Sequence, residues 1–194
     1  MDVPLAKRIA ARVRAMAIAA ALLSWTHVSA AVPGDSLEIE SGFVAPASVH
    51  ALTVPFFIDR RLPRALQPAL EEALRRLSDS RCAEIFTDFT DSGGRRLDRN
   101  LEEAATSAPS YLGLVLFYDG RSTEPCRNSQ VLAWTNPGSR AVLICWDQFS
   151  AKQRGDAGFA ANTIIHETLH TLGLGETPPD PRVITDRVAL RCGR

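Results

Sequence analysis

The stretch IIHETLHTLGLGE, from Ile164 to Glu176, contains the clearest helical pattern of the chain and decides how its C-terminal part folds. Ile165, Leu169 and Leu172 recur at the spacing of one helix face, so this face is expected to pack on the core. The pattern predicts a helix over about 157–172. The glycines that follow the leucines are typical of a helix end.

The same helix carries a histidine pair at the spacing of metal ligands. His166 and His170 are four residues apart, so their imidazoles lie one turn apart on a single face and can converge on one ion. Two imidazole nitrogens at about 2.0 to 2.1 Å suit Zn²⁺. Glu167 projects beside that ion, where it can take a proton from water as a general base. The pattern predicts a zinc site with Glu167 as its catalytic residue.

The segment HETLHTLGLGE, residues 166–176, resembles the zinc-binding helix of the zincin metallopeptidases. Its H-E-x-x-H-x-x-G-x-x-E form is most similar to the metzincin branch, whose pattern ends in His or Asp. The order of predicted strands and helices over about 51–176 is also similar to the metzincin N-terminal subdomain. The resemblance implies that Gly173 ends the helix and turns the chain back, so that Glu176 becomes the third metal ligand. It also implies zinc-dependent hydrolysis of peptide bonds.

Two features depart from the metzincin pattern. Glu176 stands where His or Asp is usual, and both methionines of the chain precede the motif, so the Met-turn is missing. A divergent zincin is therefore expected. Asp180 and Asp186 remain alternative third ligands of the aspzincin kind, although an exposed structural carboxylate is the expectation for each. His50, beside the first predicted strand, is expected to be a surface or core residue.

Four segments upstream of the motif predict strands. Residues 51–59 are rich in β-favouring side chains, and the nearly continuous apolar run 110–120 predicts a central strand that is buried on both faces. VLAWT, residues 131–135, and RAVLICW, residues 140–146, flank a Pro-Gly turn and predict an antiparallel hairpin. A peptide substrate is expected to add to the free edge at residues 131–135.

The segment PALEEALRRLSDS, residues 68–80, predicts a helix before the central strand. Pro68 suits a first helical position, and leucine and alanine recur at helical spacing on one face. The charged side chains of the other face are expected to be in water. These are Glu71, Glu72, Arg75 and Arg76.

The remaining segments complete the predicted fold. Residues 91–100 are read as a turn-rich connection, and residues 181–191 predict a last helix. The fold class is α+β and, as the resemblance implies, zincin-like. It has a mixed, mostly parallel sheet of about four strands with an antiparallel edge strand. This sheet is expected to pack on a helix and on the helix that carries the histidines.

Residues 1–30 have the pattern of an export signal, with a basic n-region, an apolar h-region over 15–25 and a small-residue cleavage site over 28–30. The h-region is too short to span a bilayer, so no membrane anchor is expected. The protein is predicted to be secreted or periplasmic. Residues 31–50 are expected to form a loose arm, and residues 51–194 a single catalytic domain.

Cysteine usage agrees with an oxidising compartment. The four cysteines, Cys82, Cys126, Cys145 and Cys192, predict two disulfides, and three pairings are open. We favour Cys126 with Cys145, because they flank the predicted hairpin, which leaves Cys82 for Cys192. A zinc site made of cysteines is disfavoured, since no two of them have C-x-x-C spacing.

The net charge of the chain limits the classes of partner that are expected. The chain has 22 basic and 22 acidic residues, and removal of the signal would leave it mildly acidic. Neither nucleic acid nor membrane is therefore expected as a partner. The predicted function is that of an exported zinc endopeptidase, with Glu167 as general base to a zinc-activated water and a protein or peptide as substrate. The alternatives are a secreted binding or inhibitory domain without turnover, and a zinc hydrolase of a non-peptide amide.

Overall fold

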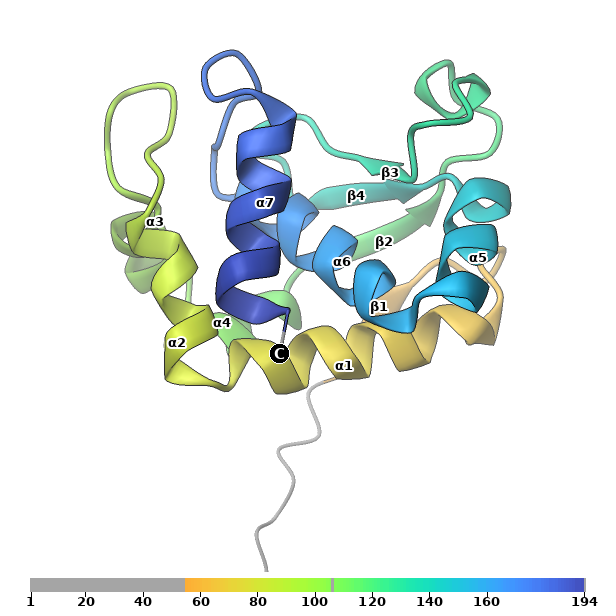
Figure 1. The fold of residues 1–194 in the computed structure, drawn as a ribbon, viewed down its shortest axis with the longest axis horizontal. Coiled ribbons are helices and arrows are strands. Elements are labelled where there is room, and N and C mark those ends of the chain that lie inside the picture. The colour runs from red at the N-terminus through yellow and green to blue at the C-terminus, as the bar shows by residue number, and fades with distance from the viewer. Residues whose placement is uncertain (1–54, 106, 194) are drawn as a thin grey trace, which may run out of the picture. The chain divides into compact units, whose positions relative to one another are not determined.

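The computed structural model describes residues 55–105 and 107–193, which form an α+β unit (Figure 1). The predicted export signal, the predicted arm, His50 and the beginning of the first predicted strand lie outside these residues. No helix in the described part of the chain has the length and hydropathy needed to cross a membrane.

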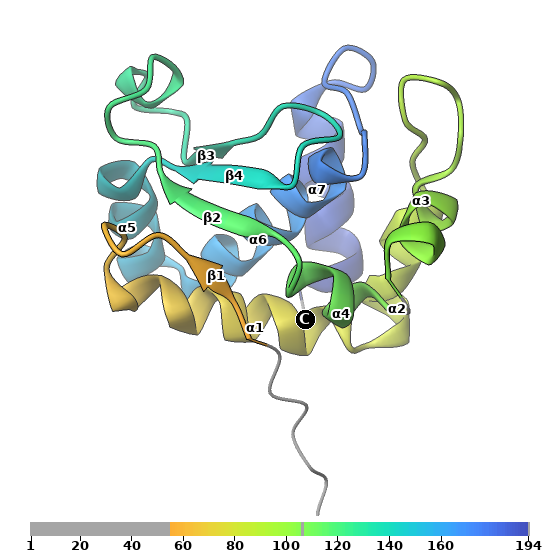
Figure 2. The same ribbon diagram turned by 180° about the vertical axis from the view of Figure 1, so that it is seen from behind.

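A four-stranded sheet with the order β1-β2-β4-β3 forms one layer of this unit. Strands β1 (Phe57–Ile58), β2 (Leu116–Asp119) and β4 (Ala141–Ile144) are parallel, whereas the edge strand β3 (Ala133–Trp134) is antiparallel to β4 (Figure 2). The mixed sheet with an antiparallel edge strand is therefore confirmed. The register pairs Ala133 with Ile144.

The predicted central strand is shorter than its apolar run. The run begins in a helix, α4 (Ala108–Leu112), which the Ser107 side chain caps by accepting from the Ser110 N–H, and which has Pro109 in its first turn. β2 is an inner strand, as predicted, but it is not buried on both faces, because Tyr118 is 40% exposed. The apolar run predicted burial without separating helix from strand.

The main helices lie on one face of the sheet, as the two opposite views show (Figures 1 and 2). The three predicted helices are confirmed as α1 (Gln67–Leu77), α6 (Ala157–Thr171) and α7 (Pro181–Cys192). The histidine-bearing α6 packs between α1, the sheet and α7. The apolar stripe predicted for α6 is buried, and the core consists of residues such as Leu70, Leu77, Phe117, Ile144, Ile165 and Leu169.

Four of the helices were not predicted: α2 (Ser80–Ala83), α3 (Leu97–Ala104), α4 and α5 (Trp146–Gly155). The connection expected over residues 91–100 is only in part a loop, because its turn, with Gly94 at φ 81°, leads directly into α3. Both α3 and α5 bury a single side chain, Leu97 and Phe149 respectively. The narrow apolar face of α5 leaves little periodic signal in the sequence, whereas α3 has Leu97 and Leu101 on one face but was interpreted as part of a turn-rich loop.

Arg76 corrects the expectation that the polar face of α1 is in water, since only 8% of this residue is exposed. Its guanidinium donates to Glu72 Oε1 at 2.7 Å, to the Gly158 carbonyl oxygen at 3.2 Å and to Asn162 Oδ1 at 2.7 Å. Since the last two acceptors belong to α6, that helix covers Arg76. The three bonds compensate the burial of the charge and join the two helices.

Both disulfides form in the pairing that was favoured from the sequence. Cys126 is bonded to Cys145, which links the segment before β3 to the end of β4. Cys82 is bonded to Cys192 over a sequence separation of 110 residues, so α7 is fixed covalently to α2. A crosslink that closes so long a loop restricts the unfolded chain and stabilises the folded state by about 4 to 5 kcal/mol.

Candidate metal centre

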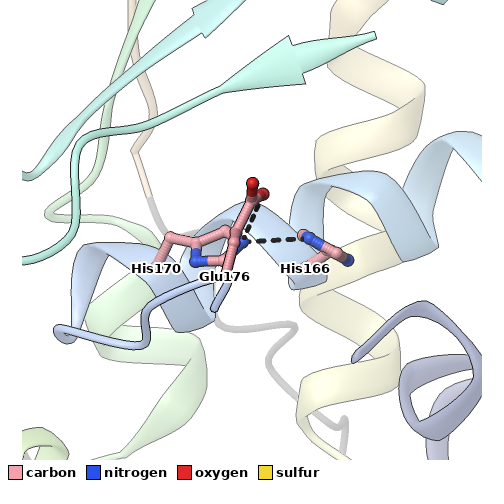
Figure 3. A group of neighbouring side chains, drawn as sticks. All are labelled: His166, His170 and Glu176. Carbon is pink, nitrogen blue, oxygen red and sulfur yellow. Dashed lines mark hydrogen bonds and ion pairs between the residues drawn. The ribbon is translucent and has the colours of Figure 1, made fainter. Parts of the chain in front are cut away.

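His166 and His170 converge from successive turns of α6 (Figure 3). The helix begins at Asp156, whose side chain accepts from the Phe159 N–H at 3.0 Å. The Nε2 atoms of the two imidazoles are 3.0 Å apart. His170 is buried and His166 is partly buried.

The other ring nitrogen of each histidine contacts a residue outside α6. The Nδ1 of His170 donates to the carbonyl oxygen of Leu174 at 2.7 Å, and because a carbonyl can only accept, the proton is on Nδ1. The Nδ1 of His166 lies 3.2 Å from the Thr185 hydroxyl of α7. These contacts orient both rings so that Nε2 faces the shared point, which is how contacts beyond the ligands orient metal-binding histidines.

Glu176 reaches the same point by a turn at Gly173. This glycine has φ 104°, and its N–H donates to the His170 carbonyl at 2.9 Å, so the chain leaves the helix and reverses there. Glu176 Oε1 lies 3.4 Å from His170 Nε2, and its side chain is 57% exposed. The turn expected at Gly173 is thus present.

His166, His170 and Glu176 could together hold a metal ion, because their ligand atoms all lie within 4.8 Å of one another. Tetrahedral zinc would separate two imidazole nitrogens by about 3.3 Å, close to the spacing of the two Nε2 atoms. Burial, and to a smaller extent the neighbouring His170, lowers the pKa of His166 to about 3, so this ring is neutral at physiological pH. Neutral imidazole is the form that binds metals.

The alternative third ligands lie elsewhere. Asp180 caps α7 by accepting from the Arg182 N–H at 2.8 Å, and Asp186 is exposed on the same helix. Among the residues that the structure describes, the candidate metal group contains neither aspartate. Its carboxylate member is Glu176.

Glu167 lies beside the cluster in a cavity and is only 5% exposed. Its Oε2 has no hydrogen-bond partner among the described residues, and neither has the nearby Thr135 hydroxyl. Burial raises the pKa of Glu167 to about 8. The nearby Thr135 hydroxyl partly opposes this rise, although the two groups do not meet the geometry of a hydrogen bond, and the charge of Glu176 adds to it. A cation at the cluster would lower this pKa. Glu167 is thus a buried carboxyl with a free oxygen beside the candidate ligands.

The cavity has a volume of about 620 Å³ and extends from the cluster along α6. It is lined by Glu167, His166 and Asn162 of α6 and by the β3 segment with Leu132 and Trp134. It is large enough for several residues of a peptide.

The edge strand beside the cavity has unpaired backbone groups. The Cys145 N–H donates to the Leu132 carbonyl at 2.9 Å, so Leu132 pairs with β4 through hydrogen bonds. Because hydrogen-bonded and non-bonded pairs alternate in antiparallel strands, the Ala133–Ile144 pair is of the non-bonded kind. The N–H and C=O of Ala133 therefore point away from β4.

Several residues around the cluster have no signal in the sequence. Thr185 lies on α7 and Thr135 directly after β3, and no spacing rule connects them with the histidines. Asn162 lies four residues before His166 on the same helix face. That offset was visible in the sequence, but its orientation depends on Arg76.

No protein-family model, no curated protein and no solved structure matches the chain. The chemistry of the candidate metal group therefore follows from the residues of this chain alone. What the fold and the site define is an α+β protein with a two-histidine, one-carboxylate group next to a buried glutamate.

Proposed function

We propose that this protein is an exported zinc endopeptidase with a divergent zincin fold, in which His166, His170 and Glu176 bind the metal and Glu167 is the general base. One observation carries the proposal. The two Nε2 atoms face each other at 3.0 Å while both Nδ1 atoms have other contacts, and a buried carboxyl with a free oxygen adjoins them.

Two imidazoles and a carboxylate are a ligand set that zinc commonly takes in hydrolases, with a fourth position left open. Bound zinc supplies a Lewis acid that polarises a carbonyl oxygen and makes water more acidic. The residues fit this ion because both rings present Nε2 and Glu176 lies on the exposed side of the cluster.

Glu167 transfers the proton in this mechanism. Its carboxylate accepts a proton from the attacking water and then donates it to the amide nitrogen that leaves. Its position beside His166 on α6 holds the carboxyl at the cavity, and its free Oε2 is available for this hydrogen bond. The Thr135 hydroxyl, which also has no partner among the described residues, is available to bind water or substrate there.

The proposed substrate is an extended peptide beside β3. The N–H and C=O of Ala133 point away from β4, so they can pair with the backbone of a peptide in the cavity. The two disulfides support export, because such bonds persist in oxidising compartments. The basic and apolar segments of residues 1–30 support it independently.

The experiment is metal analysis of the purified protein together with hydrolysis of casein, with and without a chelator. We expect one equivalent of zinc, cleavage of casein, loss of cleavage on chelation and its return on addition of zinc. Stoichiometric zinc without cleavage of casein or peptides would instead favour the binding domain without turnover. Absence of any bound metal would reject the site.

A further inference from the structure

We propose that Asn162 is a substrate-binding residue whose side-chain amide donates a hydrogen bond to a backbone carbonyl of the peptide, about one helical turn from the metal ligands. The inference rests on the proposed peptidase function. It adds a contact that holds the substrate on the α6 side of the cavity.

The orientation of the Asn162 side chain is fixed by a charge. Arg76 Nη1 donates to Asn162 Oδ1 at 2.7 Å. Because a guanidinium has only donors, the carboxamide must turn its oxygen to Arg76 and its NH₂ group away from it. The opposite orientation would place the NH₂ group of Asn162 against the N–H donors of the buried Arg76 guanidinium.

Arg76 is itself held in place on several sides. Besides Asn162, it donates to Glu72 Oε1 at 2.7 Å and to the Gly158 carbonyl at 3.2 Å. Gly158 also makes room for it, since a Cβ at that position would lie 3.0 Å from Arg76 Nη2. Arg76 is therefore a positioning residue, and rotation of the Asn162 amide would break a hydrogen bond to a buried charge.

Asn162 lines the cavity, and its NH₂ group is turned away from Arg76. The residue is partly exposed, and its Nδ2 makes no hydrogen bond to another described residue. Asn162 precedes His166 by four residues, so the two side chains lie on one face, about 6 Å apart along the axis. The free donor is thus displaced from the metal ligands by one turn.

This displacement matches the repeat of an extended peptide. A peptide paired with β3 turns alternate backbone groups away from that strand, toward α6. Carbonyls on the same side of such a chain are about 6.6 Å apart, which is close to the spacing of Asn162 and His166. When one carbonyl reaches the metal ligands, the next on that side comes to the Asn162 amide.

Three other polar side chains that line the cavity, those of Thr163, Trp134 and Thr185, already have contacts within the protein. Thr163 donates to the Phe159 carbonyl at 3.1 Å, and Trp134 donates from its indole to Thr123 at 3.1 Å. Thr185 contacts His166. Asn162 differs from them in having a donor group that is both oriented and free.

The test is the variant Asn162→Asp in zinc-loaded protein, assayed with a fluorogenic peptide that extends several residues on both sides of the scissile bond. Aspartate keeps the contact with Arg76 and strengthens it by charge, but it offers the substrate carbonyl an acceptor in place of a donor. We expect kcat/KM to fall about 10- to 100-fold, mainly through KM, with zinc content and Tm retained. Substrates shortened on one side should lose this difference between the two proteins.

The control is Asn128→Asp, which adds the same charge at an exposed residue that does not line the cavity. An equal loss of kcat/KM in both variants would mean that the effect comes from the added charge alone, which would overturn the inference. Unchanged kcat/KM in Asn162→Asp would also overturn the inference, while the proposed peptidase function would stand. A lower zinc content or a lower Tm of this variant would overturn it too, because Asn162 would then have a structural role. An inactive wild-type protein would overturn both proposals.

Discussion

The imidazole of His170 donates through Nδ1 to the carbonyl oxygen of Leu174, 2.7 Å away, and this bond connects a candidate ligand to the turn that follows its own helix. The bond places the ring proton on Nδ1 and leaves Nε2 unprotonated, which is the form that can bind a metal. The same turn, with Gly173 at φ 104°, brings Glu176 to 3.4 Å from His170 Nε2. One chain reversal thus orients one candidate ligand and positions another.

Glu167→Gln should keep the fold and the bound zinc but lower kcat by a factor of about 10² to 10⁴, because the amide cannot accept the proton of water. Steady-state hydrolysis of a fluorogenic peptide and metal analysis measure the two properties separately. Glu102→Gln, an exposed position on α3, serves as the control and should be fully active. Undiminished activity of Glu167→Gln would exclude this residue as the base.

Glu176→Ala should lower zinc affinity by more than about tenfold, because the change removes a carboxylate that lies 3.4 Å from His170 Nε2. Competition with a chromogenic chelator measures this affinity. The same change at Asp180 or Asp186 should leave zinc affinity unaltered, since neither belongs to the metal group of the described residues. A greater loss for either aspartate would transfer the third-ligand role to it.

Thr185→Val should weaken zinc binding about tenfold, since it removes the hydroxyl that lies 3.2 Å from His166 Nδ1 while it preserves the shape of the side chain. Thr163→Val is the matched control, because that hydroxyl bonds to the Phe159 carbonyl and not to a histidine. Zinc titrations of both variants decide the question. Equal affinities would show that Thr185 does not orient the ligand.

Ala133→Pro should reduce kcat/KM for long peptides while it spares zinc content. Proline removes the N–H that points away from β4, and it leaves the bond between Cys145 and Leu132 intact. Comparison of long and short peptides isolates the effect, because short substrates depend less on the strand. If zinc content falls in parallel with activity, β3 has a structural role only.

Glu72 should make stability depend on acid pH. Its hydrogen bond from Arg75, and then that from Arg76, lowers the pKa of this carboxyl from 4.5 to about 2. A pKa that is lower in the folded state contributes stability above pH 4.5, and this contribution disappears as the pH falls toward 2. Glu72→Gln should therefore lower the free energy of unfolding by about 1 kcal/mol at pH 7 and by almost nothing at pH 2. The loss at pH 7 is small because partial exposure screens the ion pairs. Urea unfolding at both pH values measures the difference, and a difference that does not change with pH would contradict this role.

The sequence predicted those features that depend on local spacing. The stripe of Ile165, Leu169 and Leu172 specified α6 and its buried face, because the helical period places these side chains together. The same period put His166 and His170 one turn apart. The hairpin turn between β3 and β4 explains why Cys126 and Cys145 were the favoured pair, which the structure confirms.

Features that depend on contacts between distant segments could not be predicted. Arg76 was expected in water because it is polar and lies on the polar face of α1, but α6 brings Gly158 and Asn162 over it. The apolar run over residues 110–120 predicted burial, but its beginning belongs to helix α4, whose start signals, Ser107 and Pro109, precede the run. Burial alone does not select between helix and strand.

For this protein, the sequence by itself determined the spacing of the histidines, the glycine that reverses the chain after them, and the offset at which Glu176 follows. Each of these is a property of backbone geometry over a few residues. Only the tertiary structure decided that Thr185 of α7 faces His166, that Glu167 is buried with a free oxygen, and that Arg76 orients Asn162. The reason is that hydrogen-bond partners and desolvation come from elements far apart in the chain, which meet only when α1, α6, α7 and the sheet pack around one core.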